Sequence, residues 1–191
     1  MAARLLFSLL LILLVGSHGA FASVQETCAK AMKGSEHKNL ESFCVTTLQA
    51  APGSASADAK GLAVIATNLT LANYTAAVAT IKELQRRGGW SDKQQAALAT
   101  CRRRYIEALN VVHSAVHALA TGRKQAYVAE MGAVRRSAID CDDAFGGRGG
   151  DDAFGGRGGD AAAKPGEAPL RKVNDDAENL TTMAMLIVIT L

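Results

Sequence analysis

Four cysteines are the residues of this chain whose type and spacing point most clearly to a chemical bond. Cys28 and Cys44 are centred on one short polar stretch, and Cys101 and Cys141 are centred on a second. If each stretch is a turn between two antiparallel helices, the members of each pair lie level with each other. Four cysteines allow three pairings. This spacing favours the disulfides Cys28–Cys44 and Cys101–Cys141, because level residues come within the Cα separation that a disulfide needs.

Two histidines form the next candidate site. His113 and His117 are four residues apart, a spacing that can place two zinc ligands on one face of a helix. Ser114 follows His113 where a metalloprotease would have glutamate, and no third potential ligand lies at a sequence spacing typical of a zinc site. We therefore interpret both as polar residues of a helix surface and expect neither a metal nor a cofactor. Histidine titrates at mildly acidic pH, so the pair could still make an interface sensitive to pH.

A glycine-rich segment is repeated in tandem. Residues 142–150 read DDAFGGRGG, and residues 151–159 repeat the same nine letters. The repeat superficially fits a calcium-binding nonapeptide, but Ala153 stands where that motif needs a large apolar residue. Its two Arg-Gly-Gly triplets resemble RNA-binding tails, but five aspartates dilute them. We interpret residues 142–160 as a duplicated surface loop, which can lengthen at little thermodynamic cost.

Basic clusters complete the polar candidates. Residues 102–104 and 135–136 are consecutive arginines on predicted helices. Such clusters are usually solvated helix faces, and the functional alternative is docking to an acidic partner surface. The sequence has no nucleophile motif, carboxylate pair or phosphate-binding loop, so we do not expect an enzyme.

The N-terminus predicts the oxidising compartment that disulfides require. Arg4 precedes an apolar run from Leu5 to Val15, and an Ala-x-Ala site ends at Ala22. This is the pattern of a secretory signal peptide, residues 1–22, and the apolar run is too short to span a membrane. Cleavage before Ser23 leaves residues 23–191 as one domain. The apolar C-terminus, residues 183–191, suits a packed last helix better than a lipid-anchor signal.

Sequons and charge agree with a secreted protein. Asn68, Asn73 and Asn179 each begin an N-glycosylation sequon. The formal net charge is +3 and falls to +2 when Arg4 leaves with the signal peptide. This is too small to indicate binding to nucleic acid or to a membrane.

Apolar periodicity predicts an all-α fold. Helices are expected over about residues 57–86, 92–120, 124–142 and 174–191, with a small helical hairpin in front, while strand signals are nearly absent. Together they predict a four-helix up-and-down bundle with two disulfides. The residues expected on the buried faces of the first three helices are, in order, Leu62, Ile65, Leu69, Ala72, Ala76 and Ala79; Leu98, Cys101, Tyr105, Ala108, Val112, Ala115 and Leu119; and Tyr127, Met131, Val134, Ala138 and Cys141.

Several segments resemble the plant invertase/pectin methylesterase inhibitor family. Residues 97–108, ALATCRRRYIEA, resemble the family pattern A-L-x-x-C-x-x-x-Y-x-x-A. Tyr127–Met131 followed by Cys141–Phe145 resembles its second signature, which ends in C-x-D-x-F. Phe43–Leu48 resembles the end of the first hairpin, and Asn179-Leu180 the last helix. The duplicated loop departs from the family pattern.

The resemblance implies a secreted protein of the plant cell wall that inhibits an enzyme by covering its active-site cleft. Invertase inhibitors often carry Pro-Lys-Phe shortly before the third cysteine, whereas residues 91–95 here read SDKQQ. This favours pectin methylesterase as the target, with cell-wall or vacuolar acid invertase as the alternative. The expected partner contacts are exposed cations on the long helices, namely Lys82, Arg86, Arg102 and Arg103.

Two hypotheses from other classes remain. The protein could be a wall module that inhibits nothing and binds acidic pectin through its basic helix faces. It could also be a carrier with a ligand in the bundle core, although the abundant alanine favours closely packed helices with little cavity.

Overall fold

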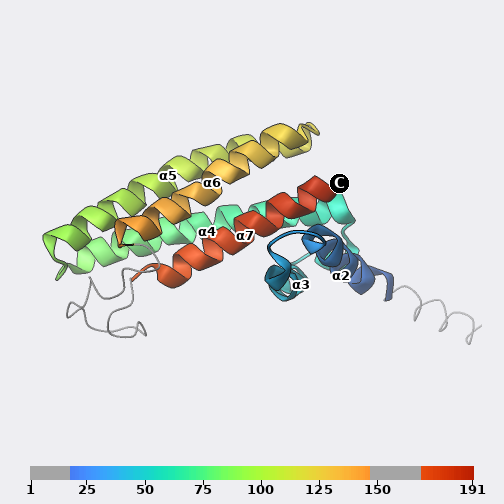
Figure 1. Cartoon of the computed structure of the whole chain (residues 1–191), viewed down its shortest axis with the longest axis horizontal. Helices are drawn as coiled ribbons and strands as arrows, with labels where there is room; N and C mark the ends of the chain where they lie inside the picture. Colours follow the sequence, from blue (N-terminus) through green and yellow to red (C-terminus); the bar gives the residue numbers. More distant parts are fainter. Residues whose placement is uncertain (1–17, 147–168) are drawn as a thin grey trace, which may run out of the picture. The chain divides into compact units, whose positions relative to one another are not determined.

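The computed structural model describes residues 18–146 and 169–191, and every regular element in these residues is helical (Figure 1). This confirms the predicted all-α fold. Two short 3-10 helices, η1 (Lys38–Leu40) and η2 (Ser54–Ser56), lie on either side of the third helix. The α-helices of the described residues are α2 (His18–Met32), α3 (Glu41–Ala50), α4 (Ala59–Arg87), α5 (Asp92–Ala120), α6 (Lys124–Ala144) and α7 (Arg171–Thr190).

Two predicted features fall largely outside the described residues. These are the first seventeen residues of the expected signal peptide and the part of the duplicated loop from residue 147 onward. The described chain divides into two compact units, residues 1–66 with 186–191 and residues 67–185. The expectation of a single domain over residues 23–191 stays a prediction.

The first unit contains the N-terminal helical hairpin. Helices α2 and α3 are joined by a turn in which Gly34 has φ of 76°, a conformation that favours glycine. The disulfide Cys28–Cys44 links the two helices with a Cα separation of 5.8 Å, and both cysteines are fully buried. A hairpin this short buries little apolar area, so the covalent link contributes much of its stability.

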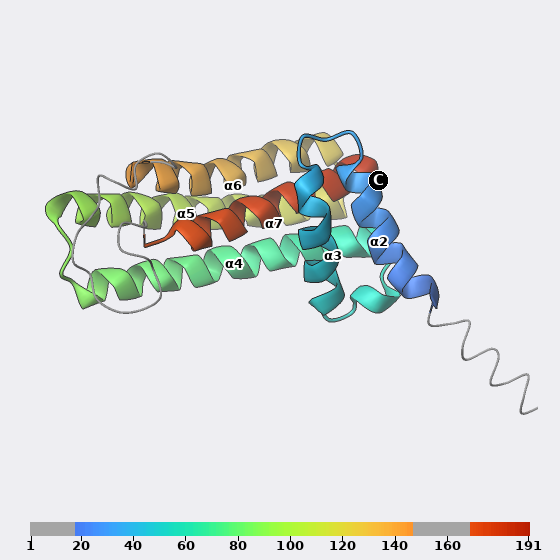
Figure 2. The same ribbon diagram turned by 60° about the horizontal axis from the view of Figure 1, so that its bottom comes forward.

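The second unit contains the bundle, in which α4, α5, α6 and α7 lie side by side in both views (Figure 2). Sharp turns join α4 to α5 and α5 to α6. Gly122, with φ of 71°, allows the chain to reverse between α5 and α6. The observed helix ends lie within three residues of the predicted ones, which is the usual spread of helix boundaries.

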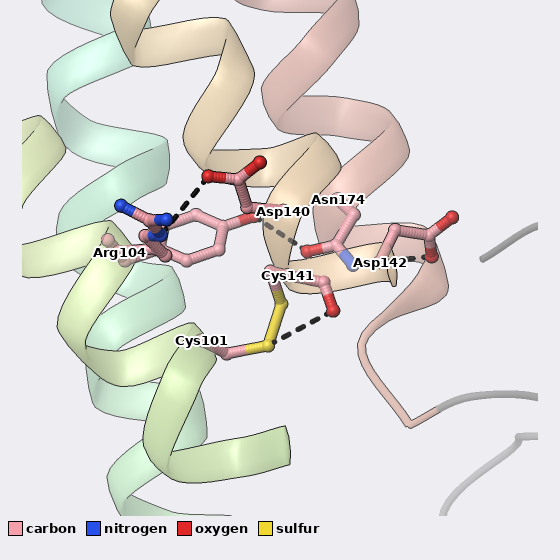
Figure 3. The surroundings of a disulfide bond; sticks show 7 residues. Cys101, Arg104, Asp140, Cys141, Asp142 and Asn174 are labelled. Atoms are coloured by element: carbon pink, nitrogen blue, oxygen red, sulfur yellow. Dashed lines mark hydrogen bonds and ion pairs between the residues drawn. A yellow bond between two sulfur atoms is a disulfide. The ribbon is translucent and has the colours of Figure 1, made fainter. Parts of the chain in front are cut away.

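Helices α5 and α6 pack as the sequence predicts. Every residue expected on their shared apolar faces is buried, including Leu98, Val112 and Met131. The disulfide Cys101–Cys141 joins the two faces with a Cα separation of 4.5 Å (Figure 3). Both disulfides therefore have the predicted pairing, and each unit contains one of them.

The buried face of α4 differs from the prediction. Leu62 is buried, Ile65 and Leu69 are half-buried, and the alanines 72, 76 and 79 are exposed. The core face instead carries Thr67, Thr70 and Tyr74 together with further apolar residues. Alanine buries little area on either face, so the larger side chains set the rotation of the helix. The additional buried apolar residues are Ala63, Ala66, Ala77, Val78 and Ile81.

Three buried tyrosines link the helices of the bundle. The Tyr74 hydroxyl donates to the Val134 carbonyl on α6 at 2.9 Å, and its ring centroid lies 4.9 Å from that of Tyr105. The Tyr127 hydroxyl is 2.7 Å from Thr67 Oγ1. Burial raises the pKa of Tyr127 to about 12, and it raises the pKa values of the other two tyrosines further above the ordinary range. The stability that the protein gains by burying these neutral hydroxyls is fully present below the tyrosine pKa of the unfolded chain. It is lost as the pH rises through the pKa of the folded state.

Helix α7 closes the bundle, as expected for the apolar C-terminus. Met183, Ala184, Ile187 and Val188 are fully buried. By length and composition α4 is the one helix of the described residues that could span a membrane, but a core helix of a soluble bundle meets the same test.

Replacing Tyr74 by Phe removes the hydroxyl and keeps the ring contact with Tyr105. We expect the free energy of unfolding to fall by about 1–2 kcal/mol, because a buried hydrogen bond is lost. Urea unfolding followed by circular dichroism measures the change. The control is Ile106→Val at a position that is 42% exposed, where a change within about 0.5 kcal/mol is expected. Equal effects of the two substitutions would contradict the role given to the hydroxyl.

Removing the disulfides one at a time tests whether each stabilises its own unit. In the chain-entropy model the 40-residue separation of Cys101 and Cys141 is worth about 4 kcal/mol, and the 16-residue separation of Cys28 and Cys44 about 3 kcal/mol. Hydrogen exchange of Cys28→Ala/Cys44→Ala should rise in α2 and α3 and stay unchanged in α5 and α6. The bundle variant Cys101→Ala/Cys141→Ala should show faster exchange in α5 and α6. Faster exchange throughout the chain in the hairpin variant would show that its disulfide stabilises both units.

Candidate functional site: the basic surface of α4 and α5

The four predicted partner contacts lie on two consecutive helices of the second unit. Lys82 and Arg86 are on the last turns of α4, and Arg102 and Arg103 are on the first half of α5. All four side chains are exposed. We call these four residues the basic surface.

The turn between α4 and α5 is closely held by side chains. Gly88 and Gly89 have φ values of 67° and 78°, which turn the chain out of α4. The indole of Trp90 donates to the Leu84 carbonyl at 2.7 Å. Ser91 and Gln94 form a capping box at the start of α5, with hydrogen bonds of 3.4 and 3.0 Å. These bonds hold the turn that joins the two helices carrying the basic surface.

The contact between Tyr74 and Tyr105 fixes the register of the two helices. The two helices run in opposite directions, so a residue a given number of positions after Tyr74 lies level with the residue the same number of positions before Tyr105. Lys82 is thus level with Ala97, and Arg103 is level with Ala76. The four cations therefore span about 15 Å along the bundle axis at ~1.5 Å per residue. They share one end of the bundle.

Glu83 holds two arginines at the end of α4. Its carboxylate accepts from Arg86 at 2.7 and 2.8 Å and from Arg87 at 3.1 Å. Hydrogen bonds from Arg86, then Arg87, lower the pKa of Glu83 to about 2. Any stability from this pairing is present above the ordinary glutamate pKa and is lost only as the pH falls through about 2. The arrangement therefore persists at mildly acidic pH.

Carboxylates on α5 and α6 bind two of the three consecutive arginines. Glu107 lies 3.6 Å from Arg103 and 3.4 Å from Arg104, and Arg104 also lies 3.1 Å from Asp140 on α6 (Figure 3). Lys82 and Arg102 have no ion-pair partner within the described part of the chain. These two cations are therefore the most available to an acidic partner.

Sequence reasoning missed Arg87 and the two carboxylates that organise the surface, and it named Arg104 only as part of an arginine cluster. The signal was present, because Glu83 and Glu107 lie three or four residues from the arginines that they bind, a spacing at which helical side chains meet.

The other candidate sites do not assemble into a reactive centre. His113 and His117 are both exposed, and the Nδ1 of His113 lies 2.7 Å from the Leu109 carbonyl. In residues 18–146 and 169–191, no group of three or more potential ligands could hold a metal ion. A shallow hollow on the hairpin is lined by Gln25, Glu26, Ala29, Glu41 and Val45, with no serine, cysteine or histidine among them.

The three sequon asparagines lie in different surroundings. Asn68 is exposed on α4, Asn73 is half-buried on the same helix, and Asn179 is half-buried on α7.

Comparison with known proteins gives one family and one fold. The model of the family described as plant invertase/pectin methylesterase inhibitor matches residues 22–187. The chain is similar in structure to a mutant form A of a pectin methylesterase inhibitor from Arabidopsis, with a TM-score of 0.63, 21% identity, and coverage of 79% of this chain and 89% of that chain. A second pectin methylesterase inhibitor, from Arabidopsis thaliana, gives a TM-score of 0.55 at 18% identity, covering 78% and 87%. No curated protein sequence matches significantly.

The pairing at Glu83 can be measured directly. We expect the carboxyl carbon of Glu83 to keep its ionised chemical shift down to pH 3.5, because Arg86 and Arg87 lower its pKa to about 2. In the variant Arg86→Ala/Arg87→Ala the group should titrate near its ordinary pKa of about 4.3. Carbon-detected NMR from pH 3 to 6 gives both curves. Titration of Glu83 near the ordinary pKa in the unchanged protein would contradict the arrangement.

Proposed function

The chain belongs to the plant invertase/pectin methylesterase inhibitor family, and we propose that it is a secreted inhibitor of plant pectin methylesterase. The single observation that carries this proposal is the family match over residues 22–187. Proteins of this family are inhibitors and are generally not enzymes themselves. The helical bundle with its two disulfides supports the same reading, since disulfides persist in oxidising compartments.

The proposed mechanism is occlusion of the target's active-site cleft by a rigid face of the bundle. An inhibitor of this kind needs no reactive group. It needs a preformed surface, because side chains and loops that are ordered before binding lose little entropy when the complex forms. The capping box at Ser91 and the contact between Tyr74 and Tyr105 support such preorganisation. Both fix the helices that carry the basic surface.

The basic surface is the proposed contact region. Exposed cations steer an acidic partner into encounter and raise the association rate. Lys82 and Arg102 contribute most in this proposal, because neither is neutralised by a carboxylate of the described chain. Arg86 and Arg103 contribute less, since Glu83 and Glu107 offset their charges.

The choice of pectin methylesterase over invertase rests on the start of α5. Ser91 is the N-cap of that helix, so Asp92 and Lys93 occupy its first turn. The Pro-Lys-Phe segment that invertase inhibitors often carry is absent here. Acid invertase remains the alternative target.

A pectin-binding wall protein without inhibitory activity is the second candidate. Lys82 and Arg102 favour it, because both are exposed and have no ion-pair partner among residues 18–146 and 169–191. They suit the carboxylates of an acidic polysaccharide as well as those of a protein. Retention on polygalacturonate that disappears in moderate salt, without inhibition of either enzyme, would support this candidate.

The deciding experiment is inhibition by the secreted, oxidised protein of a purified pectin methylesterase and an acid invertase, assayed side by side at mildly acidic pH. We expect inhibition of pectin methylesterase alone. Inhibition of invertase alone would show that acid invertase, and not pectin methylesterase, is the target. Inhibition of neither enzyme by folded, disulfide-bonded protein would remove the inhibitory function.

A pair of charge-reversal variants tests the contact region in the same assay. Lys82→Glu/Arg102→Glu should weaken inhibition roughly tenfold or more through lost charge complementarity. The matched control is Lys124→Glu/Arg136→Glu, which reverses two exposed charges on α6. Equal inhibition constants for the two variants would exclude the basic surface as the contact.

A further inference from the structure

The three sequons, equivalent in the sequence, differ sharply on the folded chain. Asn68 is exposed, whereas Asn73 and Asn179 are half-buried. An N-linked oligosaccharide is large and hydrated, so a folded protein can carry it only where the asparagine amide faces solvent. The fold therefore discriminates among the sites.

Asn68 lies opposite the buried face of α4. Thr70 and Tyr74 mark that face, and both are fully buried. Two residues of helix turn the chain by about 200°, which places Asn68 on the far side from Thr70. Asn73 follows Asn68 by five residues, a further rotation of about 140° toward the core.

The amide oxygen of Asn73 faces the protein. Its Oδ1 atom is buried and has no hydrogen-bond partner among the described residues. The next residue is Tyr74, whose ring packs on Tyr105 inside the bundle. At this half-buried position a sugar on Nδ2 has less open solvent around it than one on the exposed Asn68. Asn179 is half-buried on α7.

The surface beyond Asn68 has room for sugars. The same side of α4 carries Ala72, Thr75 and Ala79, all of them exposed and small. No long side chain from this row of α4 would collide with the first sugars of a glycan on Asn68.

We propose that Asn68 carries the N-linked oligosaccharide of this protein and that Asn73 and Asn179 stay unmodified. The proposal rests on the secretion assumed under the proposed function. In the reaction the amide nitrogen of Asn68 attacks C1 of the terminal sugar of a dolichyl-pyrophosphate-linked oligosaccharide. A C–N bond forms, the sugar–phosphate bond breaks, dolichyl pyrophosphate leaves, and the amide loses one proton. Transfer occurs on the extended chain, before α4 folds, so a chain modified at Asn73 or Asn179 would have to fold with its sugar against the bundle, and we expect the folded, secreted form to carry a sugar at Asn68 alone.

The glycan would also restrict where a partner can dock. Arg86 follows Asn68 by eighteen residues, or five turns, so both lie on one side of α4 at about 27 Å from each other. A glycan on Asn68 covers the middle of this helix face and leaves its C-terminal end open. That end carries the α4 part of the basic surface.

The test is the intact mass of the protein secreted from cultured plant cells, before and after enzymatic release of N-glycans. Four chains are compared: the unchanged protein, Asn68→Gln, Thr75→Ala and Asn179→Gln. Thr75→Ala removes the Asn73 sequon without altering Asn73, and the Thr75 hydroxyl bonds only within its own helix, to the Leu71 carbonyl. We expect one glycan on every chain except Asn68→Gln.

Three results would overturn the proposal. They are a glycan that persists on Asn68→Gln, a glycan lost from Thr75→Ala or Asn179→Gln, and absence of a glycan from the unchanged protein in the medium. Unglycosylated protein found only inside the cell would overturn both this proposal and secretion. The same preparations are assayed for inhibition, so a glycosylated protein that inhibits nothing would count against the proposed function alone.

Discussion

Three buried tyrosine hydroxyls constrain how the bundle can pack. Its helices are rich in alanine, which buries little area, so the larger rings of Tyr74, Tyr105 and Tyr127 supply much of the contact between them. Each hydroxyl must find a partner, since an unpaired buried polar group is costly. Tyr74 reaches the Val134 carbonyl, and Tyr105 donates to Asn174 Oδ1 at 2.8 Å, which connects α5 to α7. These bonds select one rotation and register for each helix, where alanine contacts alone would permit several.

This fixed packing links the core to the surface. Because the contact between Tyr74 and Tyr105 sets α4 against α5, it also sets the distance between the two pairs of exposed cations. Glu83 and Glu107 then neutralise part of that charge, and Lys82 and Arg102 remain available. A protein that acts by covering another needs this kind of rigid, charged face and no reactive group.

The sequence predicts some parts of this structure better than others, for physical reasons. The faces of α5 and α6 follow from their pattern because cysteines and large side chains such as Tyr105 and Met131 recur along them at helical spacing, with alanines between them. The face of α4 does not, because alanines at 72, 76 and 79 match the apolar period but gain little from burial, whereas Thr67 and Tyr74 are buried through hydrogen bonds. Exposure of the four cations follows from their type, since lysine and arginine are rarely buried unless paired. Which of them are neutralised depends on side-chain contacts such as that of Arg104 with Asp140 on another helix.

The central claim is that a preformed face of the bundle, carrying the basic surface, covers the target enzyme. Hydrogen exchange of the protein with and without a saturating amount of pectin methylesterase tests it most directly. The account predicts slower exchange in the segment from Lys82 to Arg103 and unchanged exchange at the solvent-facing start of α6. Protection confined to the hairpin of α2 and α3, or an unchanged exchange pattern in an inhibited complex, would contradict it.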